Sequence, residues 1–240
     1  MNLIFGFREK NLNFQPIFLI AVSFFGLFFL MIMYLWAPQR NLYYPFQKTA
    51  ILSIFIVICL LGVLAAIRPS TCKTVMQFQK DSEKTTRNNN IQFEGHHPDC
   101  GKFSSHTLNI NGKKYCPGCL GLSIGAFIAV IGTVIYYFHG FTSSYEEIIF
   151  WIGLCMVFLA LFLIVIFNLE KKLKFLLNIV LVVGSFLILV GVDSVKANLL
   201  IEVYFLILIM FWILTRMIVS ETSHERICRD CLNGSTCIYK

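Results

Sequence analysis

Cysteine and histidine side chains at the spacing of metal ligands are the residues of this chain best suited to chemistry. Cys116 and Cys119 are separated by Pro-Gly, and 15 residues lie between Cys100 and Cys116. A Cys-x-x-Cys pair lets both thiolates reach one ion at about 2.3 Å, and tetrahedral zinc takes four such ligands. We therefore predict a Cys₃His zinc site that is completed by Cys100 and by one of His96 and His97, with the choice of histidine left open.

A β-hairpin is predicted directly before this cysteine pair. Asn111-Gly112 separates two strand-like runs. Asn-Gly is the strongest short signal for a hairpin, because both turn residues adopt positive φ. The hairpin would deliver Cys116 to the site, so residues 93–119 are expected to form a small zinc-ribbon-like module.

A second set of ligand-type residues lies in the C-terminal tail. His224 is followed by Cys228, Cys231 and Cys237. These four residues make another plausible Cys₃His set. Because the sequence does not show whether the tail packs against the module, we predict either one shared zinc site or two separate sites.

Two other kinds of chemistry use the same residues. The first is thiol exchange by Cys116 and Cys119, because a helix N-terminus favours the thiolate form. The second is metal-dependent catalysis, in which Asp99, Ser105 and His106 surround an open coordination position that activates water. An iron–sulfur cluster is disfavoured by the histidines. Enzymatic activity stays an open question at this point.

The elements that must position these residues are membrane-spanning helices. The chain is 57% hydrophobic and only 14% charged, whereas soluble proteins carry about 25% charged residues. A span needs about 20 apolar residues. Six such runs occur, at residues 17–36, 50–67, 120–138, 148–167, 173–192 and 199–219.

The predicted fold is therefore an all-α integral membrane protein, a six-helix transmembrane bundle with the zinc-ribbon-like module as a cytoplasmic insertion. The chain divides into four parts. These are an N-terminal arm with two spans (1–67), a long loop that holds the module (68–119), four further spans (120–219) and the cysteine-rich tail (220–240).

Lysine and arginine residues predict the orientation of the bundle. Seventeen of the 20 fall in the N-terminal arm, the long loop, the fourth connection and the tail, and the others are Arg40, Lys48 and Lys196. Because such residues hold short loops in the cytoplasm, we place the termini and the module on the cytoplasmic side of the cell membrane. A reducing cytoplasm favours metal binding over disulfides.

The same charge distribution bears on partners. The net charge of +7 reflects orientation, so no nucleic-acid partner is expected. The lipid bilayer itself is the predicted environment, and the basic face can attract anionic lipid head groups or a cytoplasmic protein. The oligomeric state is not predicted.

Polar and small residues inside the predicted spans also carry information. Four charged residues lie near span ends, where we expect them to extend toward water; they are Lys174, Asp193, Glu202 and Arg216. The deep interior has almost no ionisable group, which weighs against an ion-coupled transporter. Gly121, Gly125 and Ala129 recur every four residues, a pattern that favours tight helix packing over a substrate groove.

Residues 97–125 resemble a prokaryotic family of predicted multi-pass membrane proteins that is known only as a domain of unknown function. The likeness rests on His-x-x-Cys, the hairpin, and Cys-x-x-Cys-x-Gly-x-x-x-Gly running into an apolar helix. Many bacterial members have an arginine before the second cysteine of the pair, where this chain has Gly118, as do sequences of archaeal type. The resemblance implies cytoplasmic metal-type ligands on a helical bundle and implies no activity.

Three functions follow, in order of preference. The first is a membrane-anchored zinc-binding protein in which the metal organises the loop and the tail. The second is a membrane-embedded, metal-dependent enzyme that acts on a lipid or isoprenoid at the inner leaflet. The third is a thiol-redox membrane protein that uses Cys116 and Cys119.

Overall fold

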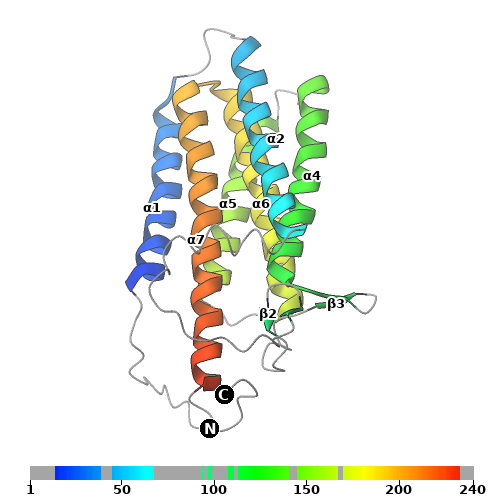
Figure 1. The fold of residues 1–240 in the computed structure, drawn as a ribbon. Helices are drawn as coiled ribbons and strands as arrows, with labels where there is room; N and C mark the ends of the chain where they lie inside the picture. The colour runs from blue at the N-terminus through cyan, green and yellow to red at the C-terminus, as the bar shows by residue number, and fades with distance from the viewer. Residues whose placement is uncertain are drawn as a thin grey trace, which may run out of the picture.

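Six long helices make up most of the part of the chain that the structure, a computed structural model, describes (Figure 1). This part is residues 14–38, 45–67, 93–94, 97–98, 108–110, 113–140, 145–166 and 170–232, with side chains over 17–38, 46–64, 116–140, 145–164 and 170–219. The helices are α1 (Phe14–Trp36), α2 (Pro45–Ile67), α4 (Pro117–His139), α5 (Glu146–Ile166), α6 (Lys171–Val195) and α7 (Leu199–Leu232). Each is long and apolar enough to cross a membrane, which confirms the predicted six-span bundle.

The helix α6 forms the centre of the bundle. Both α4 and α5 pack on α6, while α2 packs on α4 and α1 packs on α7 (Figure 1). In α6, 61% of the span is buried, against 22% to 44% in the other five. Neighbouring helices therefore cover α6, and the other helices form the surface that faces lipid.

The small-residue face of α4 lies against α6. A Cβ atom added at Gly125 would lie 3.0 Å from Cβ of Val182, and one added at Gly121 would overlap the carbonyl oxygen of Phe175. Ala129 on the same face is fully buried. The prediction of tight helix packing is confirmed, because only residues with little or no side chain permit such a close approach.

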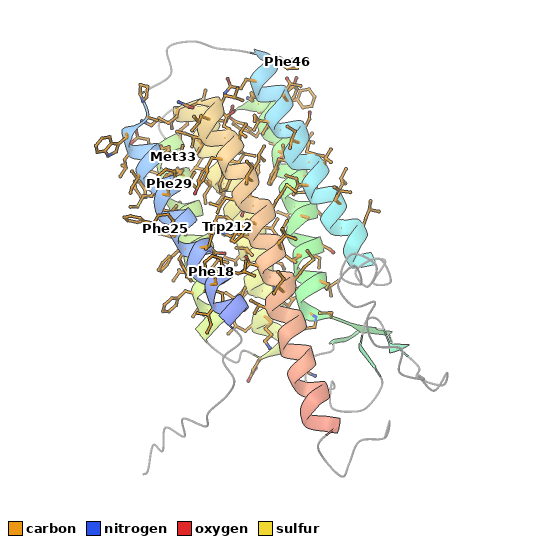
Figure 2. All side chains as sticks on the ribbon, turned by 60° about the vertical axis from the view of Figure 1, so that its left-hand side comes forward. Phe18, Phe25, Phe29, Met33, Phe46 and Trp212 are labelled. Carbon is orange, nitrogen blue, oxygen red and sulfur yellow. The ribbon has the colours of Figure 1, made fainter. Side chains whose placement is uncertain are left out.

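Apolar side chains cover the outside of the bundle. Phe18 and Phe25 project from α1 with 53% and 69% of their surface exposed, whereas Trp212 lies among the helices at 2% (Figure 2). Phenylalanine side chains exposed on a membrane-spanning helix are stabilised by contact with hydrocarbon, whereas their exposure to water would cost free energy. The chain is a multi-pass membrane protein.

Two acidic residues lie at the end of the bundle remote from Cys116, and the prediction that they extend toward water is wrong. Asp193 is 3% exposed and Glu202 is fully buried. The Tyr136 hydroxyl donates a hydrogen bond to Oδ2 of Asp193 at 2.5 Å, and Nε2 of Gln47 donates one to Oε2 of Glu202 at 2.9 Å. Both acids lie on inward faces of their helices, so neighbouring helices supply the hydrogen bonds.

Replacing Tyr136 by phenylalanine is expected to lower the free energy of unfolding by about 1–3 kcal/mol, because buried Asp193 loses its donor. The hydroxyl also lies 2.9 Å from Oγ of Ser194. The neighbouring Tyr137 provides a matched control, since its hydroxyl pairs with Thr49 at an exposed site. Tyr137→Phe should change stability by less than about 0.5 kcal/mol. Thermal unfolding in detergent measures both variants, and equal effects would contradict the prediction.

Two short antiparallel strand pairs precede α4. β1 (Phe93–Glu94) pairs with β2 (His97–Pro98), and β3 (Leu108–Ile110) pairs with β4 (Lys113–Tyr115). Ile110 lies opposite Lys113. This pairing confirms the predicted hairpin, whereas Asn111 and Gly112 themselves lie outside the described residues. The strands lie at the end of the bundle where α4 begins (Figure 1).

The helix α7 continues well beyond its membrane span. Its 34 residues correspond to about 51 Å of helix, whereas a hydrocarbon core is about 30 Å thick. The extension passes the ends of the other helices on the side where β2 and β3 lie (Figure 1). Residues 220–232, where the predicted tail begins, are therefore helical.

Candidate metal centre

The segment Cys116–Cys119, hereafter the knuckle, forms the start of α4. Cys116 is the N-cap residue, with extended backbone angles of φ −73° and ψ 120°, and Pro117 follows in the first turn. Proline is favoured there because its missing N–H would have no partner inside the helix, and its φ already suits a helix. The N–H of Leu120 donates to the carbonyl oxygen of Cys116 at 3.0 Å. Cys119 therefore lies in the first helical turn.

This placement brings both cysteines to the positive end of the α4 dipole. A helix N-terminus favours a thiolate over a thiol, and the thiolate is the form that binds a metal or attacks a disulfide. The local sequence explains the geometry, because β4 leads straight into Cys116 and Pro117 starts the helix.

A cation from another helix lies beside the knuckle. Arg216 of α7 interacts electrostatically with Cys116 and Cys119. Its guanidinium occupies the space next to Gly118, where any Cβ atom would overlap it. Nε of Arg216 donates a hydrogen bond to Oδ1 of Asn178 on α6. Arg216 thus joins α7 to the starts of α4 and α6.

A second cation completes this group. Lys174 interacts electrostatically with Cys116 and with Arg216, and its carbonyl oxygen accepts a hydrogen bond from Nδ2 of Asn178 at 2.5 Å. Over the ranges whose side chains are described, no carboxylate forms an ion pair with either cation. Two like charges in a partly buried site repel each other, so thiolates at the knuckle would stabilise this arrangement.

Sequence reasoning missed the role of Arg216 and Lys174, because both were expected to extend from span ends toward water. The structure places them beside the knuckle. Lys174 and Asn178 are four residues apart and so share one face of α6. A polar side chain inside an apolar span is a signal for a buried partner, and Asn178 was the available clue.

Three of the predicted tail ligands lie on the extension of α7. His224, Cys228 and Cys231 are separated by four and then three residues along this helix. Positions with that spacing share one helix face. The helix therefore gathers these three positions on one face, at the same end of the bundle as the knuckle.

The remaining predicted site residues are only partly covered by the structure. His97 is part of β2, and five others lie outside the described residues, as does Cys237. Those five are His96, Asp99, Cys100, Ser105 and His106. Among the side chains that the structure describes, no group of three or more His, Cys, Asp or Glu could hold a metal ion. Of the predicted ligands, that set includes only Cys116 and Cys119.

No protein-family model, curated protein or solved structure matches this chain. The resemblance of residues 97–125 to a family of membrane proteins therefore stays a prediction, and the geometry of the knuckle is the basis for a function.

Proposed function

We propose that the chain is a membrane-anchored zinc-binding protein whose metal is structural. Zinc is bound by Cys116 and Cys119 together with Cys100 and one of His96 and His97. The metal would tie the start of a membrane span to the loop that precedes it. Lysine and arginine counts favour the cytoplasm for this side, where the assembled loop can bind a protein partner or anionic head groups.

One observation carries this proposal. Two cysteines, separated by two residues, lie at the positive end of α4 and next to Arg216 and Lys174. Helix dipole and cations both stabilise thiolates, and zinc requires deprotonated sulfur ligands. The β3–β4 hairpin leads directly into the first of these cysteines, as in a ribbon-type site.

The resemblance of residues 97–125 supports the same function. Many bacterial members of that family carry an arginine at the position of Gly118. In this chain Arg216 brings its guanidinium to Gly118 from α7. A cation next to the cysteine pair is thus supplied by a different helix.

The extension of α7 adds a second set of candidate ligands. His224, Cys228 and Cys231 share one face of this helix. They either bind a second zinc ion together with Cys237 or contribute to the first site. In both cases zinc would connect the last span to the rest of the protein at the knuckle end, which is the end of the bundle where α4 begins.

Elemental analysis of the purified full-length protein tests this proposal. We expect one or two zinc ions per chain, with Zn–S distances of about 2.3 Å by X-ray absorption. The variant Cys228→Ser/Cys231→Ser separates the alternatives: it should retain one of two ions if there are two sites, and lose the single ion if the site is shared. Protein that contains no zinc after expression in zinc-rich medium would overturn the proposal.

The thiol-redox alternative is supported by the same N-terminal position of the knuckle on α4, since exchange also requires a thiolate. It predicts that Cys116 and Cys119 form a reversible disulfide and react with maleimide whether or not zinc is present. Structural zinc predicts protection of both thiols from maleimide until a chelator is added. Mass spectrometry of the labelled protein distinguishes the two functions.

A further inference from the structure

A cavity of about 120 Å³ lies among four helices next to the knuckle. Its walls are apolar side chains of α2, α4, α6 and α7, including Phe55, Leu122, Leu181 and Ile213. An apolar cavity of this size does not hold water stably and instead takes an apolar guest. The walls therefore select hydrocarbon.

The polar groups of the wall do not alter that selection. Ser185 lines the cavity, but its hydroxyl donates a hydrogen bond to the carbonyl oxygen of Leu181 at 2.9 Å within α6. A hydroxyl that already donates a hydrogen bond within its own helix does not need a hydrogen-bond partner from the bound molecule. The guest needs no polar group at this depth.

The cavity is elongated along the helices. On α7 it extends from Ile209 to Met217, which is about 12 Å of helix and less than half of a membrane core of about 30 Å. Cys119 lines the end of the cavity at the knuckle. On α2, Gly62 borders open space, because a Cβ atom there would have no neighbour within 4 Å. The cavity thus accommodates part of a chain that enters from one leaflet.

Both cations of the candidate metal centre are located at that end. Arg216 lies on α7 between the wall residues Ile213 and Met217 and interacts electrostatically with Cys119, which is itself part of the wall. Lys174 interacts electrostatically with Arg216 and therefore lies at the same end of the cavity. Among the side chains that the structure describes, no carboxylate forms an ion pair with these two residues. The end of the cavity is therefore suited to a negative group and repels a positive one.

We propose that this cavity binds a single-chain amphiphile, with its hydrocarbon chain between α2 and α7 and its anionic head beside Arg216 and Lys174. The neighbouring packing permits entry from the bilayer, because α2 packs chiefly on α4 and α7 chiefly on α1. Amphiphile binding does not require zinc, so we expect metal-free protein to bind the amphiphile as well. The proposal is therefore independent of the function proposed above.

Fluorescence of Trp212 tests this proposal. Trp212 lines the cavity and is 2% exposed, and the only other tryptophans are Trp36 and Trp151. The variant Trp36→Phe/Trp151→Phe leaves one reporter. In phosphatidylcholine nanodiscs, a fatty acid brominated at mid-chain should quench Trp212 saturably, because bromine quenches on contact. An alkyl phosphate with the same brominated chain distinguishes a carboxylate head from a phosphate head, and saturable quenching by either supports the proposal.

Two comparisons locate the bound chain and the head. Gly62→Leu adds side-chain volume to the cavity wall at a position where a Cβ atom has no neighbour within 4 Å, and we expect it to weaken quenching at least about tenfold. Ala126→Val fills the opposite wall and replaces it if the leucine variant does not fold. Leu61→Phe, on the exposed side of α2, should leave quenching unchanged. A trimethylammonium amphiphile with the same chain should bind at least about tenfold more weakly than the anionic one. Lys174→Gln should reduce this difference in affinity.

Quenching that rises linearly with the amount of brominated lipid, and that Gly62→Leu does not affect, would show that Trp212 is reached by bulk lipid and would overturn the cavity assignment. Equal affinity for the anionic and the cationic amphiphile would overturn the assignment of an anionic head.

Discussion

Serine at both Cys116 and Cys119 is expected to lower bound zinc by about one ion per chain, because the proposed site would lose two of its four ligands. A serine hydroxyl is not deprotonated at neutral pH and does not replace a thiolate as a zinc ligand. Elemental analysis of the purified full-length protein measures the change. Unchanged zinc in this variant would show that the knuckle is not a zinc site.

Cys155 provides the matched control for this experiment. It is an exposed cysteine on α5 within the membrane span, so Cys155→Ser should retain the zinc content of the natural chain. A third variant, Arg216→Met, keeps both knuckle cysteines and removes the neighbouring cation. By analogy with residues that surround metal ligands elsewhere, it should bind zinc about 10- to 100-fold more weakly in competition with a chelator.

A single methyl group at Gly121 is expected to have the second large effect. The added Cβ atom would overlap the carbonyl oxygen of Phe175 and lie 3.0 Å from Cβ of Asn178 on α6. A backbone carbonyl inside a packed helix cannot move aside, so α4 and α6 must separate. Gly121→Ala should therefore lower the free energy of unfolding by about 1–3 kcal/mol.

The same substitution at Gly62 isolates the effect of crowding. Gly62→Ala introduces a Cβ atom that has no neighbour within 4 Å, and alanine is the better helix former by about 1 kcal/mol. Thermal unfolding in detergent should therefore show a loss of stability for the first variant and none for the second. Similar melting temperatures for the two variants would contradict the close packing of α4 on α6.

The spans could be predicted from sequence because hydrocarbon imposes a length on each apolar run. The first span, 17–36, is the same in the sequence and in the structure. The second begins earlier than predicted, because Gln47 and Lys48 have partners on other helices: Gln47 bonds Glu202, and Nζ of Lys48 lies 4.2 Å from the centre of the Tyr136 ring. Such partners are distant in sequence and leave no local pattern.

For the candidate metal centre, too, the sequence predicted the local residues but not their distant partners. Spacing alone identified Cys116 and Cys119, and Asn-Gly identified the hairpin that precedes them. Spacing could not identify Arg216, because its position beside Gly118 depends on how α7 packs against α4 and α6. Local chemistry is thus visible in the sequence, whereas the electrostatic environment of a site requires the packed structure.

The uninterrupted course of α7 has a consequence for its extension. No loop separates the membrane span from His224, Cys228 and Cys231, so the helical phase of the span determines the direction in which these three positions face. Each residue of an α-helix turns the chain by about 100°. One residue inserted after Val219 would therefore rotate this face by more than a quarter of a turn, although no ligand-type residue would have changed. Rotation of α7 within the membrane would likewise turn this face at the surface, so the single helix would couple its rotation in the bilayer to the direction of these candidate ligands.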